Sequence, residues 1–307
     1  MELKEKIEKA DLEIEKSKIL YNEEMKKYTT FKVGGKAECL IKIDNIKDLK
    51  SILRFVNENG IPLTVLGNGS NVLVSDKGIK GITIIIKIEK IDIKEKNGKV
   101  EITVGAGEKI GKLGVLFLKN EITGFEELSG IPGTIGGATR MNAGAHGREI
   151  KDIVKIVKCV DNKGNEKEFS NEQMEFGYRT SILKKEKYIV TEVKIELEKG
   201  NKEEIQNKMN EYAKYRKEKQ PIEYPSAGST FKRPEGYFAG KLISDAGLKG
   251  FTCGGACVSE KHAGFVVNKG NATAADVIKL TDEVSEKIYE LNGVKLELEV
   301  KKLGFEE

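Results

Sequence analysis

A glycine-rich stretch, GIPGTIGGATRMNAGAHG at residues 130–147, constrains this chain more than any other feature. It holds six glycines and no acidic residue, in a protein in which 33% of the residues are charged. Glycine lets the backbone adopt φ > 0 and approach a ligand closely. The stretch predicts a backbone that meets something large and anionic, with an ordinary turn as the alternative.

A second glycine-rich segment, VLGNGSNVLVSD at residues 65–76, strengthens the ligand interpretation. Successive backbone N–H groups in such a turn can bind an anion, usually phosphate. The candidate residues are Gly67, Asn68, Gly69, Ser70 and Asn71. No GxxxxGK[ST] sequence is present, which excludes a P-loop. The sequence VGAGEKIG at 104–111 lacks the spacing and the parallel βαβ context of a dinucleotide fingerprint, so we interpret it as a turn.

The composition is typical of a soluble globular protein with two or three compact units, at 307 residues and 38% apolar content. Lys and Arg number 53 against 49 Asp and Glu, a net charge of +4, which argues against a dedicated nucleic-acid binder. We expect no membrane span and no signal peptide, and therefore a cytoplasmic protein. Four cysteines and two histidines favour buried thiols over disulfides or a zinc site, so no metal is expected.

The hydrophobic pattern predicts an α+β fold in three successive parts, at residues 1–88, 89–200 and 201–303. Helices are expected at 1–26, 46–58, 109–119, 201–219, 237–246 and 273–291. Strands are expected at 37–43, 63–66, 71–75, 81–88, 99–107, 152–161, 188–200 and 294–303. The turn NKGN at 162–165 lies between two β-rich runs and is a hairpin signal.

Several polar side chains could do chemistry. Tyr178 and Arg179 lie in FGYRTS, where the arginine could clamp a carboxylate or form a surface ion pair. Ser229 lies in the rigid loop YPSAGSTFKRP; since no Ser-His-Asp arrangement is evident, it is a proton donor rather than a nucleophile, or a plain loop serine. Glu297 and Glu299 would share one side of the last strand. His146 and His262 are isolated, and we interpret both as structural.

The ordered set of motifs resembles the UDP-N-acetylenolpyruvylglucosamine reductase family, flavoenzymes that make UDP-N-acetylmuramate for peptidoglycan. The resemblance covers about residues 28–303 and rests on TTFKVGG, VLGNGSNVLVSD, GIPGTIGGATRMNAGA, FGYRTS, KQPIEYPSAGSTFKRP, AGKLISDAGLKG, SEKHAGFVVN and LELEV. The short loop after Pro234, together with SEKHAGF, resembles the shorter subclass, which lacks an extra substrate-capping loop.

The resemblance implies a vanillyl-alcohol-oxidase-type FAD-binding region of two subdomains and a C-terminal substrate-binding domain. It also implies that NADPH reduces FAD, which then reduces the enolpyruvyl group of the sugar nucleotide. Both glycine-rich segments would contact the FAD. In the second of them the residues concerned are Gly130, Ile131, Gly133, Thr134, Gly136, Gly137, Asn142, Gly144 and Ala145.

By the same resemblance, Arg179 and Glu299 would hold the substrate carboxylate and stabilise the charge that develops beside it. Two carboxylates repel when both are ionised, so Glu299 would be protonated or paired with Arg179. Ser229 would be the general acid that protonates C2 of the substrate. Tyr178, Lys219 and Arg233 would be further substrate contacts.

Two alternatives stay open. One is another FAD-dependent oxidase or dehydrogenase of this fold acting on an alcohol or sugar, for which His146 is the nearest candidate for covalent flavin attachment. The other is a non-catalytic module that binds a flavin or a sugar nucleotide. For the reductase interpretation we expect a monomer that binds the small-molecule substrate UDP-N-acetylenolpyruvylglucosamine, with no nucleic-acid or membrane partner.

Overall fold

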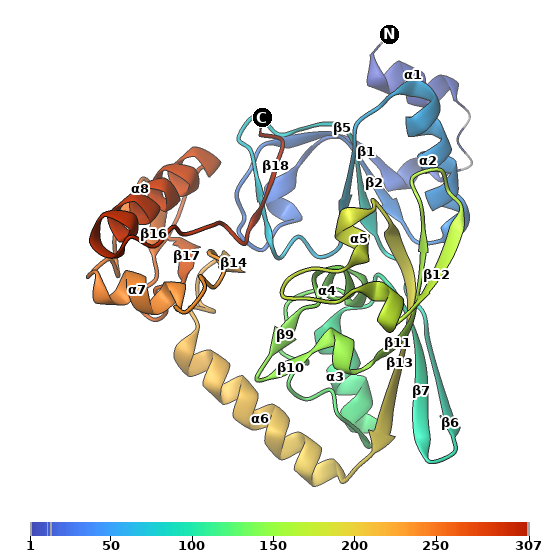
Figure 1. The fold of residues 1–307 in the computed structure, drawn as a ribbon. Helices are drawn as coiled ribbons and strands as arrows, with labels where there is room; N and C mark the ends of the chain where they lie inside the picture. Colours follow the sequence, from blue (N-terminus) through green and yellow to red (C-terminus); the bar gives the residue numbers. More distant parts are fainter. Residues whose placement is uncertain (1, 11, 13, 306–307) are drawn as a thin grey trace. The chain divides into compact units, whose positions relative to one another are not determined.

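The computed structural model describes residues 2–10, 12 and 14–305. Its contacts divide the chain into two compact units, each built from separated segments (Figure 1). Unit 1 comprises residues 1–21, 39–68 and 81–215, and unit 2 comprises residues 22–38, 69–80 and 216–307. The division into parts at 1–88, 89–200 and 201–303 stays a prediction. No helix in the described part of the chain is long and apolar enough to cross a bilayer.

A four-stranded sheet has the order β1-β2-β5-β3, and β3 runs parallel to β5. Its strands are β1 (Ile19–Glu24), β2 (Lys36–Ile43), β3 (Leu63–Leu66) and β5 (Ile79–Ile86). Helix α2 (Ile46–Asn59) follows β2. The Asn45 side chain caps its first turn, and Gly60, at φ 61°, ends it. Its apolar face is buried, and the helix predicted at 46–58 is confirmed.

A six-stranded antiparallel sheet forms most of the rest of unit 1, with the order β12-β11-β13-β7-β6 and β8 also paired to β13. The strands are β6 (Ile91–Lys96), β7 (Lys99–Gly105), β8 (Ile122–Thr123), β11 (Val154–Val160), β12 (Glu166–Ser170) and β13 (Ile189–Lys199). The expected NKGN hairpin joins β11 to β12. Helix α3 (Ile110–Lys119) follows β7. Because β7 is antiparallel to both neighbours, VGAGEKIG is a turn outside any βαβ unit.

Unit 2 contains a four-stranded antiparallel sheet with the order β14-β17-β16-β15. These strands are β14 (Ser226–Ser229), β15 (Thr252–Cys253), β16 (Ala256–Val258) and β17 (Phe265–Asn268). Helices α7 (Ala239–Asp245) and α8 (Ala274–Asn292) flank it (Figure 1). A capping box between Thr273 and Asp276 starts α8, and Gly293 ends it. A short parallel pair, β4 (Val72–Val74) with β18 (Lys301–Leu303), completes the unit.

Helix α6 (Lys202–Lys219) is long and highly charged, and Ile205 is its one buried residue. Its charged side chains therefore form a solvated helix surface. The remaining elements are short: α1 (Leu3–Lys9), α4 (Ile135–Met141), α5 (Ile182–Lys185), β9 (Gly144–Ala145), β10 (Arg148–Glu149) and the 3-10 turns Lys16–Lys18, Met25–Lys27, Ile150–Asp152 and Glu172–Met174.

The predicted helix over 1–26 is wrong beyond its first turns. Helix α1 ends at Lys9, and residues 19–24 form strand β1, which pairs with β2. The run Ile19, Leu20 and Tyr21 suits a half-buried strand, and pairing with a distant strand outweighs local helix propensity. Ile7 and Ile14 still bury their side chains in the core of unit 1. Of the predicted helix, residues 1, 11 and 13 lie outside the described residues.

The predicted last strand is also too long. Only Lys301–Leu303 forms β18, whereas residues 294–300 are irregular apart from a single bridge between Leu298 and Phe231. Glu297 and Glu299 are thus not in a strand. The segment is held instead by hydrogen bonds to the chain around Phe231.

The four cysteines are free thiols. Cys39, Cys159 and Cys257 are buried as expected, whereas Cys253 is half-buried. Burial raises the pKa of the Cys159 thiol to about 12, which leaves it protonated and unreactive at neutral pH.

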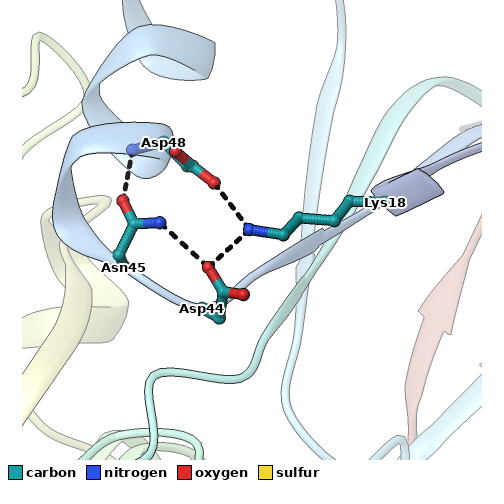
Figure 2. A network of polar contacts seen from close by, with 4 residues as sticks. All are labelled: Lys18, Asp44, Asn45 and Asp48. Carbon is teal, nitrogen blue, oxygen red and sulfur yellow. Dashed lines mark hydrogen bonds and ion pairs between the residues drawn. The ribbon is translucent and has the colours of Figure 1, made fainter. Parts of the chain in front are cut away.

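A polar network joins the start of β1 to the N-terminus of α2 (Figure 2). The Lys18 ammonium donates to Asp44 at 2.8 Å and to Asp48 at 3.3 Å. The Asn45 side chain donates to Asp44 at 2.9 Å and accepts from the Asp48 N–H at 2.8 Å. The hydrogen bond from Lys18 lowers the pKa of the Asp44 carboxyl, and the same bond raises the pKa of Lys18.

Candidate active site

The two glycine-rich segments meet in unit 1. A Cβ added to Gly67 would lie 2.5 Å from Thr134 Oγ1, so this position admits only glycine without movement. The Asn68 side chain donates to the carbonyl oxygen of Pro132 at 3.3 Å. Two segments that are about 65 residues apart in the sequence therefore pack against each other, as a shared ligand site requires.

The rest of the first segment, residues 69–71, lies in unit 2. Gly69 has φ +62°, and a Cβ there would lie 2.0 Å from the carbonyl oxygen of Tyr28. The Asn71 side chain donates to the carbonyl oxygen of Glu299 at 3.4 Å. Within the described part of the chain, the backbone N–H groups of residues 68–71 have no protein acceptor. Four successive unused donors fit an anionic ligand.

The second segment contains the short helix α4. The Thr134 hydroxyl caps it by accepting from the Gly137 N–H at 3.3 Å. A Cβ on Gly136 would lie 2.7 Å from the Cβ of Ala106, so Gly136 serves close packing of α4 on the end of β7. Most N–H groups here are used inside the protein, namely those of Ile131, Gly133, Ile135, Gly136 and Gly137. Gly130 is exposed at the start of the segment.

The end of the second segment is a tight hairpin. Gly144 and Ala145 form β9, which pairs with β10 across a turn made by His146 and Gly147, both with φ > 0. The His146 ring stacks on Tyr212 of α6 with ring centroids 4.2 Å apart. This packing supports the structural interpretation of His146.

Tyr178 and Arg179 occupy the tip of a turn in unit 1. The turn is closed by reciprocal backbone hydrogen bonds between Gly177 and Thr180, at 3.1 and 3.2 Å. Arg179 has φ +55° and is half-buried, and its guanidinium lies 5.3 Å from the Tyr178 ring centre. The tip thus presents a cation and an aromatic ring.

Ser229 and Glu299 come together in unit 2. Ser229 is the exposed last residue of β14 and pairs with Phe265 of β17. Its neighbour Thr230 accepts the Glu299 N–H on its carbonyl oxygen at 2.8 Å. Ser229, the predicted general acid, and Glu299, the predicted carboxylate, therefore lie on adjoining backbone segments, although 70 positions separate them in the sequence.

Thr230 is a positioning residue that the sequence analysis missed. It is buried, and its hydroxyl accepts the Val266 N–H at 2.8 Å while its own N–H donates to Gly264 at 2.8 Å. These bonds fix the backbone on the C-terminal side of Ser229. The only local signal was a second hydroxyl residue after Ser229 in GSTF, and that pattern is too common to identify it.

The other predicted substrate residues are at the surface. Lys219 is exposed at the end of α6, and Arg233 is exposed in the loop before α7. The Arg233 guanidinium lies 3.9 Å from the ring centre of Phe238, a cation–π contact that orients it. His262 accepts the Gly264 N–H on Nδ1 at 3.1 Å, and burial lowers its pKa, so this ring supports the loop as a neutral side chain.

Fold and site together define a flavoprotein. Residues 37–170 match the family model of the FAD binding domain, and residues 220–303 match that of the C-terminal domain of UDP-N-acetylenolpyruvoylglucosamine reductase. The predicted fold class, an FAD-binding region followed by a C-terminal α+β domain, is confirmed.

Named relatives are similar in sequence to this protein over nearly its whole length. UDP-N-acetylenolpyruvoylglucosamine reductase of Clostridioides difficile (strain 630) is 49% identical, over 95% of both chains. The protein of that name from Caldanaerobacter subterraneus subsp. tengcongensis is 47% identical, also over 95% of both. The crystal structure of the Thermus caldophilus reductase matches with a TM-score of 0.78 and 36% identity, over 93% of this chain and 98% of that one. The chain belongs to the UDP-N-acetylenolpyruvoylglucosamine reductase family.

Proposed function

We propose that Ser229, Arg179 and Glu299 perform the substrate chemistry of this chain, an FAD-dependent oxidoreductase that uses NADPH to reduce UDP-N-acetylenolpyruvylglucosamine to UDP-N-acetylmuramate. The activity itself rests on family membership over 95% of the chain. The observation that carries the residue assignment is the joining of Ser229 and Glu299 through Thr230. The alternative of an oxidase for an alcohol or sugar is not favoured, because the named relatives are reductases.

The residues present fit FAD. The unused N–H groups of residues 68–71 suit its diphosphate, and no carboxylate side chain lies in either 67–71 or 130–147 to repel it. When bound, FAD carries the reducing equivalents from NADPH to the substrate. We propose contacts to FAD from Gly67, Asn68, Gly69, Ser70, Asn71, Gly130, Ile131, Gly133, Thr134, Gly136, Gly137, Gly144 and Ala145. The FAD contact expected of Asn142 stays a prediction, and a positioning role is inferred for it below.

The chain's own groups would act on the substrate as follows. Arg179 and Glu299 bind the substrate carboxylate and stabilise the enolate charge that develops next to it. Ser229 donates its hydroxyl proton to C2, which is feasible because an enolate in a water-excluded site is a strong base. Tyr178, Lys219 and Arg233 would bind the rest of the sugar nucleotide, the two cations suiting its diphosphate.

The substitution Ser229→Ala tests the acid assignment. In anaerobic stopped flow, reduction of the bound flavin by NADPH should keep its rate. Reoxidation by the enolpyruvyl sugar nucleotide should slow by about 10²–10⁴-fold, the usual effect of losing a positioned general acid. Ser226→Ala at the other end of β14 is the matched control and should change neither rate. An unchanged reoxidation rate in Ser229→Ala would remove Ser229 from the mechanism.

Three further expectations remain proposals. Buried free thiols such as Cys39 and Cys159 suit a reducing compartment and support a cytoplasmic location, which cell fractionation would test. Light scattering on the purified protein would test the expected monomer. Limited proteolysis would test the division at 1–88, 89–200 and 201–303, since cleavage should concentrate near residues 88 and 200.

A further inference from the structure

Asn142 follows helix α4 directly, in the segment expected to contact FAD. Its side chain is fully buried, at 0% exposure. Its backbone is left-handed, with φ +44°, a conformation that asparagine tolerates better than most residues.

The side-chain amide of Asn142 is used inside the protein. Nδ2 donates to the carbonyl oxygen of Gly177 at 3.1 Å and to Glu149 Oε2 at 3.1 Å. Oδ1 accepts the Lys151 N–H at 3.0 Å. An amide nitrogen has two hydrogens, and both are used here. Asn142 therefore links three segments of unit 1, namely the end of α4, residues 149–151 and the turn that begins at Gly177.

That turn carries Tyr178 and Arg179 at its tip. The Gly177 carbonyl oxygen accepts from both the Thr180 N–H and Asn142, so the base of the turn is fixed to α4. Arg179 adopts φ +55°, a strained conformation for a residue with a side chain, which persists only where the surroundings hold it. Asn142 supplies one of the contacts that hold it.

A second contact ties the same turn to α4. The Ser181 hydroxyl, just after the turn, donates to the carbonyl oxygen of Arg140 in α4 at 2.8 Å. The Arg140 guanidinium in turn donates to the carbonyl oxygens of Leu183 and Tyr188, which follow the turn. Helix α4 and the chain on both sides of Arg179 are thus held together by side-chain hydrogen bonds.

We infer that Asn142 is a positioning residue for the reduction step: it holds the turn of Arg179 on the end of helix α4 and so sets the place of the guanidinium that binds the substrate carboxylate. This inference rests on the proposed role of Arg179. The expected contact of Asn142 with FAD stays a prediction.

The substitution Asn142→Gly tests the inference, because glycine keeps the left-handed backbone and removes the side chain with its amide. Flavin reduction by NADPH should stay within about twofold of the unmodified enzyme, with FAD retained. Reoxidation by the enolpyruvyl sugar nucleotide should slow by about 10–10²-fold, as expected for a misplaced binding group. In an Arg179→Ala background, Asn142→Gly should cause no further loss, since it acts through Arg179.

Asn171→Ala is the matched control. Its side-chain amide also donates two hydrogen bonds to backbone carbonyls, those of Lys151 and Val154, both at 2.7 Å, but it does not contact the Arg179 turn. Both half-reactions should be unchanged in this variant. If Asn142→Gly does not fold, Ser181→Ala should give the same selective slowing of reoxidation, because it removes the second tie between the turn and α4.

The outcomes separate the inference from the function on which it rests. If Arg179→Ala slows reoxidation but Asn142→Gly does not, or if the two losses multiply in the double variant, the inference is overturned and the role of Arg179 stands. Equal slowing of both half-reactions, or loss of FAD in Asn142→Gly, also overturns it. If Arg179→Ala leaves reoxidation unchanged, the proposed role of Arg179 and this inference fall together.

Discussion

The two glycine-rich segments are alike in sequence, but their backbones are used differently. In residues 130–147, most N–H groups donate to acceptors within the protein. In residues 68–71, four successive N–H groups have no acceptor in the described part of the chain. Backbone donors that a protein leaves unused are the ones a ligand can take up. The first segment is therefore the better candidate for binding the diphosphate, and the second for shaping the walls of the site.

The glycines of the second segment support this distinction. Gly136 has no room for a side chain because the end of β7 packs against it, whereas its neighbour Gly137 is exposed and meets only Thr134 Oγ1, at 3.4 Å. Glycine content alone therefore does not show whether a backbone approaches a ligand or its own chain. The hydrogen-bond acceptor of each N–H group and the space around each Cβ position distinguish the two cases.

Of the effects that distinguish the two segments, the largest is expected for binding of the diphosphate. If residues 68–71 bind it, riboflavin, which has no phosphate, should bind the apoprotein at least about 10²-fold more weakly than FAD. Hydrogen bonds to charged groups are worth about 1.5–3 kcal/mol each, and each 1.4 kcal/mol is a factor of ten in affinity. Fluorescence titration of the two flavins measures the ratio. Equal affinities would contradict the assignment of these N–H groups to the diphosphate.

A pair of adjacent glycines tests the packing role of the second segment. Gly136→Ala places a methyl group 2.7 Å from Ala106 Cβ and should lower the free energy of unfolding by about 1–3 kcal/mol, as overpacked sites do. Gly137→Ala has room for the methyl group and should leave stability unchanged or raise it slightly, since alanine favours helices. Denaturant unfolding of the apoproteins measures both. A stable Gly136→Ala variant would show that this close contact is not required.

The smallest effect should come from a region that belongs to neither segment. Lys18→Met removes the ammonium from the network of Figure 2 and should lower the melting temperature slightly, with no change in FAD affinity. Because Lys18 lowers the pKa of Asp44, its contribution is present above the unfolded carboxyl pKa near 4 and is lost as the pH falls through the lower folded value.

Thermal melts from pH 7 down to pH 3 would check this sign. The difference in melting temperature between Lys18→Met and the unmodified protein should be largest near pH 7 and should close below about pH 4. Lys16→Met, at an exposed lysine in the same short turn, is the control. A difference that grew with acidity would contradict the role assigned to the Asp44 carboxylate.

The sequence predicted elements whose signals are local. Helices α2 and α8 were both predicted within one residue of their observed bounds; in the structure, Asn45 and a capping box at Thr273 start them and glycines end them. The N-terminal helix was overpredicted because the competing interaction, the pairing of β1 with β2, is not local.

In the site, too, long-range contacts could not be predicted from local sequence signals. The candidate residues could be named from the motifs and the family resemblance. Their contacts could not, since the bond from Asn142 to Gly177 spans 35 positions and that from Asn71 to Glu299 spans 228. Asn142 was expected to contact FAD because the family resemblance implies it. Its burial and the use of both amide hydrogens, from which we infer that it holds the Arg179 turn, could not be predicted from one sequence.

The central claim is that this chain passes reducing equivalents from NADPH through FAD to the enolpyruvyl sugar nucleotide. An anaerobic visible spectrum of the purified protein tests it most directly, first with NADPH and then with UDP-N-acetylenolpyruvylglucosamine. The account predicts that the flavin band bleaches with NADPH and recovers when the sugar nucleotide is added. Bleaching without recovery would contradict the substrate assignment, and a protein that binds no flavin even with added FAD would contradict the account as a whole.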